Sequence, residues 1–153
     1  MIRKATLADI PRMVELGHEM HSESQYSRLD YNPVGTAAFL RICITNPNPE
    51  VGTGIVLVAE ENAEVIGGMV GFVMQHWFGG GLMACDQALF ISKEKRGGMA
   101  GARLIIAYEK TARELGATQI IISNSTNVNT DRTAGLYARV GFEHVGYVFS
   151  KFV

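Results

Sequence analysis

The sequence predicts a mixed α/β fold built around one sheet. Strand-like and helix-like segments follow one another in the order β-α-α-β-β-β-α-β-α-β. Three consecutive strand-like segments favour antiparallel pairing, whereas the strand–helix–strand unit of residues 84–123 favours one parallel pair. The chain has 153 residues, of which 47% are apolar and 19% charged, the composition of a compact globular protein. We therefore expect residues 1–153 to form a single domain.

In the first half of the chain, we expect two helices between a short strand and a hairpin. The strands are residues 1–5, 55–60 and 65–75, and the helices are residues 6–22 and a segment that begins at residue 33. Thr6 can cap the first helix, with Asp9 placed as in a capping box. Pro33 suits a first helical position, and the asparagine–proline run 46–49 ends that second helix. Glycines at positions 67, 68 and 71 indicate a bulge or a close approach by another group.

In the second half, strands alternate with helices. We expect strands over residues 82–91, 118–123 and 142–149, a helix that Gly116 ends, and a helix over residues 133–140 that Gly141 ends. The first of these helices carries Leu104, Tyr108 and Ala112 at spacings of four residues, which is the period of one helix face. Three isoleucines in a row at positions 120–122 are typical of a buried strand.

The turn between residues 91 and 100 is rich in glycine and positive charge. Arg96, Gly97 and Gly98 follow an apolar strand, and a helical pattern begins directly after them. Strand, glycine-rich turn and helix is an arrangement that can present free backbone N–H groups to a phosphate. A tight turn that needs unusual dihedral angles is an equally good interpretation of the same residues. Neither a P-loop sequence nor a dinucleotide-binding glycine fingerprint occurs in the chain.

Composition excludes several other classes of protein. A net charge of −1 argues against a broad nucleic-acid surface, and two cysteines are too few for a disulfide framework. The four histidines and two cysteines do not have metal-ligand spacing, so we expect buried reduced thiols and no metal site. The charged N-terminus does not fit a signal peptide, and the longest uncharged apolar run, residues 65–74, is too short to span a bilayer. We therefore expect a cytoplasmic protein that does not contact membranes.

Two segments resemble the GCN5-related N-acetyltransferase (GNAT) superfamily, and the likeness in element order covers essentially the whole chain. Residues 89–102, LFISKEKRGGMAGA, are similar to the family's fourth strand and its [QR]-x-x-G-x-[GA] pyrophosphate loop, with Met99 in the place of the first glycine. Residues 133–142, TAGLYARVGF, are similar to its A-x-x-L-Y-x-x-x-G-F segment, with Thr133 in the place of the alanine. The resemblance implies a central mixed, mostly antiparallel sheet of six to seven strands flanked by about four helices.

The resemblance also implies a binding site for acetyl-coenzyme A. The pantetheine arm would lie along the backbone of three strand residues, Leu89, Phe90 and Ile91. The pyrophosphate loop would comprise Arg96, Gly97, Gly98, Met99, Ala100, Gly101 and Ala102. The side chain of Met99 must then point away from the phosphates, and we expect Gly98 to absorb the conformational demand. Asn129 is a further candidate contact, one position from the family's usual asparagine.

The implied reaction is direct transfer of an acetyl group to a primary amine in a ternary complex. Tyr137 corresponds to the family's general acid, because a phenol with a pKa near ~10 stays protonated at neutral pH. Packing beside Leu136 is the alternative role for this ring. Asp86 is a candidate base, although it stands one residue from the family's register and would face the other side of a regular strand. His76, Glu19, Glu23 and a water chain remain alternatives for the base.

The acceptor is not identified by the sequence, and a small molecule and a protein amine both remain open. Tyr26 and Tyr31, in a polar segment between the first two helices, are the candidate acceptor-binding residues, and an exposed polar loop is the alternative. A homodimer is possible. A catalytically weak acyl-coenzyme A-binding module that acts through protein contacts is the second hypothesis for function, and a nucleotide-binding regulator is the third.

Overall fold

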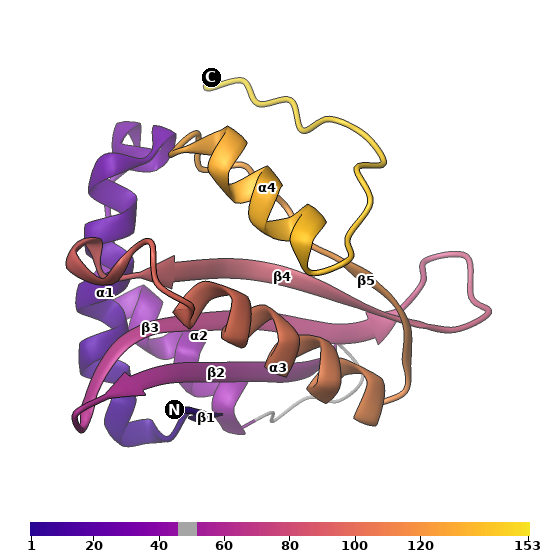
Figure 1. Ribbon diagram of the computed structural model, residues 1–153, viewed down its shortest axis with the longest axis horizontal. Helices are drawn as coiled ribbons and strands as arrows, with labels where there is room; N and C mark the ends of the chain where they lie inside the picture. The colour runs from indigo at the N-terminus through magenta and orange to yellow at the C-terminus, as the bar shows by residue number, and fades with distance from the viewer. Residues whose placement is uncertain (46–51) are drawn as a thin grey trace.

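The computed structural model describes residues 1–45 and 52–153. The proline-rich run 46–49, predicted to end the second helix, lies outside the described residues. Within them, one open sheet has the strand order β1-β2-β3-β4-β5 (Figure 1). The strands are β1 (Ile2–Lys4), β2 (Thr53–Glu61), β3 (Glu64–Gln75), β4 (Leu82–Ile91) and β5 (Ala117–Ile121). Neighbouring strands are antiparallel except β4 and β5, which are parallel.

Helices cover both faces of this sheet. The α-helices are α1 (Ile10–Glu23), α2 (Pro33–Thr45), α3 (Ala100–Glu114) and α4 (Thr130–Arg139). Three short 3-10 turns, η1 (Leu7–Asp9), η2 (Gln25–Arg28) and η3 (Lys93–Lys95), join these elements. Helices α1 and α2 pack on one face of the sheet, and α3 packs with α4 on the other (Figure 1). The predicted fold class, a mixed sheet flanked by about four helices, is confirmed.

The core is divided by the sheet into two layers, as the two-residue period of a strand requires. Along β2, Ile55 and Leu57 point toward α3, whereas Val56 and Val58 point toward α1 and α2. Each of these four side chains is at most 6% exposed. Because both faces of β2 and β3 are covered, these strands are apolar along nearly their whole length rather than alternating with polar residues.

A β-bulge interrupts the pairing of β3 with β4, close to the point that the glycines of β3 indicated. Val70 pairs with Ala88 but Gly71 pairs with Asp86, so that Gln87 is the extra residue. A Cβ atom on Gly71 would lie 2.2 Å from the Tyr108 hydroxyl oxygen, which no side chain could tolerate. That hydroxyl donates a hydrogen bond of 2.9 Å to the Cys85 carbonyl oxygen, directly before the bulge. The absence of a side chain at Gly71 therefore leaves space for the buried Tyr108 side chain of α3 to reach β4 and bond to it.

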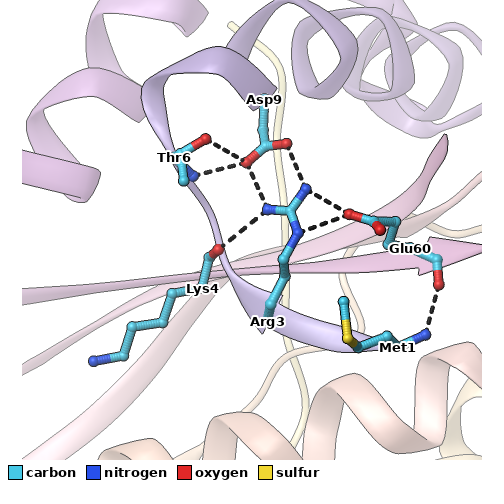
Figure 2. Close-up of polar contacts among 6 residues, drawn as sticks. All are labelled: Met1, Arg3, Lys4, Thr6, Asp9 and Glu60. Carbon is cyan, nitrogen blue, oxygen red and sulfur yellow. Dashed lines mark hydrogen bonds and ion pairs between the residues drawn. The ribbon is translucent and has the colours of Figure 1, made fainter. Parts of the chain in front are cut away.

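The start of the chain is fixed by a network of charges on Arg3 (Figure 2). Its guanidinium donates to both carboxylate oxygens of Asp9 at 2.8 and 2.9 Å and to Glu60 at 2.7 Å. The backbone N–H of Thr6 donates to Asp9 at 2.7 Å, which is the predicted capping contact. The hydrogen bonds from Arg3 hold the pKa of Asp9 well below its usual range. This network joins β1 to the beginning of α1 and to the end of β2.

The predicted last strand, residues 142–149, is not formed, and the sheet has five strands instead of six to seven. Residues 142–153 have no regular secondary structure and run past α4 (Figure 1). Tyr147 is 81% exposed and Phe149 is 89% exposed. A strand obtains its backbone hydrogen bonds from a neighbouring strand, so an apolar pattern without a partner does not produce one. In the parts of the chain that the structure describes, no helix is both long and apolar enough to cross a membrane.

Candidate active site

The candidate site lies where β4 and β5 part. The two strands pair only from Leu82–Ala117 to Cys85–Ile121, whereas β4 continues to Ile91 with β3 as its partner. The second half of β4 therefore has a free edge on its β5 side, with backbone groups available to another extended chain. A cavity of about 540 Å³ opens at this point. Its wall on one side comes from η3, α3 and α4, here called the α3 side, and on the other from α1, η2 and α2, the α1–α2 side.

Most residues predicted to bind a cofactor line this cavity. The strand residues Leu89, Phe90 and Ile91 do so, as do Arg96, Gly97, Gly98, Gly101 and Asn129. Met99, Ala100 and Ala102 do not line it with their side chains. Ala102 is 9% exposed and packs into the core, whereas Met99 is 63% exposed. The methionine that stands in the place of a motif glycine therefore directs its side chain away from the cavity, as the sequence argument required.

Gly97 provides the unusual backbone conformation of the turn, and the expectation for Gly98 is wrong. Gly97 has φ +97°, and a Cβ atom there would lie 2.8 Å from a guanidinium nitrogen of Arg132. Gly98 has no positive φ, and a Cβ on it would meet no atom closer than the Lys95 carbonyl oxygen at 3.6 Å. The positive φ falls on Gly97, two residues after η3 ends at Lys95 and three residues before α3 begins at Ala100.

The first turn of α3 presents its N–H groups toward this turn. The helix begins after Met99, with no capping side chain, and its first hydrogen bond runs from the Arg103 N–H to the Met99 carbonyl at 3.0 Å. The N–H groups of residues 100–102 therefore precede the internal hydrogen bonds of the helix, and they carry the positive end of its dipole. An anion at this position would receive several backbone hydrogen bonds at once.

The three basic side chains around the turn make different contacts. Arg96 donates to the Ile91 carbonyl at 3.0 Å and forms an ion pair with Glu23 of α1, so it ties the turn to β4 and to the α1–α2 side of the cavity. Lys95 pairs with Glu61 at 3.2 Å. Among the described residues Arg132 makes no ion pair, and it lines the cavity beside Gly97. It is consequently the cation best placed to meet an anion at the start of α3.

Asp86 and Tyr137, the two predicted catalytic residues, meet at the backbone of Ser123. The Ser123 N–H donates to the Asp86 carboxylate at 2.9 Å, and the Tyr137 hydroxyl donates to the Ser123 carbonyl at 3.0 Å. Both side chains line the cavity. The one-residue offset of Asp86 does not turn it away, because the bulge at Gln87 breaks the alternation of β4.

This position changes the acidity of both groups. Burial raises the pKa of Asp86 from 3.8 to about 6, a shift that the hydrogen bond from Ser123 opposes. Burial, with the nearby Asp86 charge, raises the pKa of the Tyr137 hydroxyl well above 10. At neutral pH the carboxyl group is therefore mostly ionised and more basic than an ordinary aspartate, while the phenol keeps its proton.

The other candidate bases are less well placed. His76 stacks on Phe78 at a centroid distance of 4.8 Å and does not line the cavity. Glu19 accepts a hydrogen bond of 2.7 Å from the Lys93 N–H, and Glu23 is paired with Arg96. In the described part of the chain, Asp86 is the carboxylate of the cavity wall that has no cationic partner.

Tyr26 and Tyr31 both line the α1–α2 side of the cavity. The predicted polar loop contains the 3-10 turn η2, which is held against the segment after β5. Gln25 and Tyr26 contact Ser125, with 2.9 Å between the Tyr26 hydroxyl and the Ser125 hydroxyl oxygen. The segment is therefore an ordered part of the cavity wall rather than a free loop.

Three residues of this site were not found by sequence reasoning. Ser123 contacts Asp86 and Tyr137 through its backbone N–H and carbonyl, which residue type does not reveal, and its side chain also hydrogen-bonds Asp86. Arg132 approaches Gly97 only after folding, although a cation in the first turn of α4 was visible in the sequence. Asn124 donates to the Thr130 carbonyl at 2.8 Å, and its own side-chain oxygen is buried without a protein partner among the described residues. Asn124 is a residue of the cavity wall, but this oxygen is itself covered by other protein atoms.

Comparison with known proteins identifies the family. Residues 52–144 match the acetyltransferase (GNAT) domain, which is more than half of the chain. The chain belongs to the GNAT acetyltransferase family. The matched region contains β2 through α4, and therefore the glycine-rich turn, Asp86 and Tyr137. The resemblance noted in the sequence is thereby confirmed.

Solved structures of other GNAT-like proteins have the same fold. A transcriptional regulator from Bacillus halodurans superposes with a TM-score of 0.77 at 19% identity, over 100% of this chain and 99% of its own. Glucosamine-6-phosphate N-acetyltransferase from Arabidopsis thaliana gives 0.75 at 13% identity, over 99% and 97%. An aminoglycoside acetyltransferase from an uncultured soil metagenomic sample gives 0.71 at 16%, over 100% and 97%. These identities show a shared fold alone. Comparison with curated protein sequences found no match.

Proposed function

We propose that this GNAT protein transfers an acetyl group from acetyl-coenzyme A to a primary amine, by direct attack in a ternary complex. The observation that carries the proposal is that Asp86 and Tyr137 bond the N–H and the carbonyl of the same residue, Ser123, in the cavity between β4 and β5. A base and an acid are thereby held close together where two strands leave room for a substrate.

The residues on the α3 side fit acetyl-coenzyme A. The free edge of β4 from residue 86 to 91 suits the amides of a pantetheine arm, which can bind like an added strand. The uncapped first turn of α3, Gly97 and Arg132 suit the pyrophosphate, because a helix start and a cation both favour an anion.

The proposed reaction needs two proton transfers. The amine nitrogen forms a bond to the acetyl carbon, the carbon–sulfur bond breaks, and the sulfur leaves with the electron pair. Asp86 takes the proton that the amine loses, for which a pKa of about 6 is suitable at neutral pH. Tyr137 gives its proton to the departing sulfur, after its hydroxyl turns from the Ser123 carbonyl toward the cavity.

Calorimetry and a thiol-release assay test this proposal together. We expect acetyl-coenzyme A to bind the purified protein, and an amine from a mixed panel to cause release of free thiol. Asp86→Asn should retain binding, because an amide oxygen can still accept from the Ser123 N–H, but should lose most of the thiol release. Absence of acetyl-coenzyme A binding would exclude the proposed function.

The same experiment separates the alternative functions. Binding of acetyl-coenzyme A without thiol release from any amine would favour a non-catalytic acyl-coenzyme A-binding module. Displacement of coenzyme A by a nucleotide such as ATP would favour a nucleotide-binding regulator. The pairing of Asp86 with Tyr137 at Ser123 supports the enzyme over both, since neither alternative needs an acid and a base.

A further inference from the structure

The α1–α2 side of the cavity has an apolar floor. Met13 of α1, Leu40 of α2 and Val70 of β3 all line the cavity, and each is at most 4% exposed. Phe39 of α2 lines it as well and packs edge-on against Phe72 at a centroid distance of 5.9 Å. A ligand that enters this side therefore meets carbon atoms first, and burial of its own apolar surface is the available source of affinity.

Polar atoms on the same side are already used within the protein. The Tyr31 hydroxyl donates to the Val14 carbonyl at 2.7 Å, and the Thr36 hydroxyl donates to the Asn32 carbonyl at 2.9 Å. The Tyr26 hydroxyl donates to Ser125. These residues consequently present ring and methyl surface to the cavity instead of free hydroxyl groups.

Tyr31 forms a fixed aromatic wall. Its ring stacks on His18 at a centroid distance of 4.7 Å and lies 5.2 Å from the ring of His21. A Cβ atom on Gly17 would lie 3.1 Å from the Tyr31 hydroxyl oxygen, so that glycine allows the tyrosine to approach α1 closely. A ring held by stacking and by a hydrogen bond loses little further freedom when a ligand packs against it.

The charges of the cavity disfavour an acceptor with several positive groups. Two carboxylates line it, Glu23 and Asp86, and Glu23 is paired with Arg96. One carboxylate, Asp86, therefore remains for an amine. The cations of the lining that make no ion pair among the described residues are Arg132 and Arg139, since Lys95 is paired with Glu61. A polyamine or an aminoglycoside would bring additional ammonium groups that find no described partner in this wall.

We infer that the acceptor is a small primary amine attached to an aromatic or aliphatic body, with no second positive charge. The inference rests on the proposed function and deepens it. The amine would lie toward Asp86, and its apolar body would lie between Tyr31, Phe39 and the floor formed by Met13 and Leu40. The same chemistry could be offered by a free arylalkylamine or by the first residue of a peptide that begins with phenylalanine.

A panel of amines tests the inference with the full chain and acetyl-coenzyme A. Phenethylamine and tryptamine represent the free amines, a phenylalanine-initiated peptide represents the other source, and spermidine and kanamycin represent polycations. We expect thiol release from the free arylalkylamines at least about tenfold faster, as kcat/KM, than from the polycations. A preference for spermidine or kanamycin would overturn the inference and leave the proposed function intact. A preference for the peptide would overturn the assignment to a small amine and would assign the same apolar site to a protein N-terminus.

Matched variants of Tyr31 locate the amine on the α1–α2 side. Tyr31→Ala removes the ring and should raise the KM for phenethylamine about tenfold, whereas Tyr31→Phe keeps the ring and should change it about twofold or less. The KM for acetyl-coenzyme A should stay unchanged in both. An equal effect of the two substitutions would show that the hydroxyl, and not the ring, matters, and would contradict the inference.

If no amine of the panel reacts, equilibrium binding still tests the apolar acceptor site separately from the proposed acetyl transfer. Calorimetry with phenethylamine and with spermidine, each added to the protein saturated with coenzyme A, measures the site without turnover. Binding of phenethylamine alone would then support the apolar site while the proposed function fails. Failure of phenethylamine to bind would overturn the inference by itself.

Discussion

The two sides of the cavity present their binding groups in different ways. The α3 side offers backbone: the free edge of β4, the positive-φ turn at Gly97 and the first N–H groups of α3. The α1–α2 side offers side chains whose polar atoms are already bonded within the protein, as for Tyr26 and Tyr31. The α3 side is suited to an extended, anionic ligand, which backbone groups can bind whatever the side chains are. The α1–α2 side is suited to a ligand selected by its shape and apolar surface.

The difference follows from the range of the contacts that build each side. The turn and the helix start lie within about a dozen neighbouring residues, so a short motif specifies them. The α1–α2 side depends on contacts between distant segments, such as that of Gln25 with Ser125, 100 residues apart. Asp86 and Ser123 lie between the two sides, and Tyr137 reaches Ser123 from α4 on the α3 side.

Tyr137→Phe should give the largest effect, a fall in kcat, without weakening the binding of either substrate. Loss of the phenolic proton removes the acid that protonates the departing sulfur, so kcat should fall about 100-fold. The KM for acetyl-coenzyme A and the KM for the best amine should change little, because the ring remains. Steady-state thiol release measures all three constants. A kcat within twofold of wild type would remove Tyr137 from the mechanism.

Gly97→Ala should weaken the α3 side alone. The substitution forces a residue with a side chain into φ +97° and toward Arg132, at a cost of about 1–2 kcal/mol. If that strain displaces the turn, the KM for acetyl-coenzyme A rises about tenfold, and the KM for the amine stays constant. Gly135→Ala is the matched control, since a Cβ there meets no atom within 4 Å and the position is helical. Equal effects of the two variants would contradict the role of Gly97.

Features that local rules determine could be predicted from the sequence. Two of the helices were expected from signals at their first residues, Asp9 accepts the capping hydrogen bond, and Gly71 of β3 lies opposite the bulge in β4. The glycine-rich turn between a strand and a helix was also predictable, but the residue that carries positive φ is Gly97 and not Gly98. Which of two adjacent glycines turns the chain depends on where η3 ends, and composition does not reveal that.

Features that need a distant partner could not be predicted. Residues 142–149 have the alternating pattern of a strand, yet the segment finds no strand beside it and Phe149 is 89% exposed. The register argument for Asp86 failed for a related reason, because the bulge that reorients it is fixed by Tyr108 on α3. Ser123 contacts Asp86 and Tyr137 through its backbone N–H and carbonyl, and its role became visible only with both partners in place.

Asp86→Asn should show that the ionised carboxylate of Asp86 lowers the stability of the folded protein. The pKa of Asp86 is about 6 when folded and 3.8 ordinarily, so the folded protein binds this proton more tightly than the unfolded chain. The ionised group therefore destabilises the fold, with no cost below about pH 4 and the full cost above about pH 6. Asp86→Asn should melt at least about 2 °C above wild type at pH 7.5, and the difference should shrink toward pH 4. Thermal unfolding at several pH values measures it, and a difference independent of pH would contradict the burial argument.

Met99→Gly should give the smallest effect, and it examines the α3 side most directly. The substitution restores the glycine that the family's motif has at this position. The side chain of Met99 is 63% exposed and lies outside the cavity, and its φ of −88° does not require glycine. A glycine at a helix N-cap changes stability by only a few tenths of a kcal/mol, so the KM for acetyl-coenzyme A should change by about twofold or less. A tenfold fall in that KM would mean that side-chain clearance limits binding there. The α3 side would then resemble the α1–α2 side, with specificity set by side chains, and the distinction between backbone and side-chain recognition would not hold.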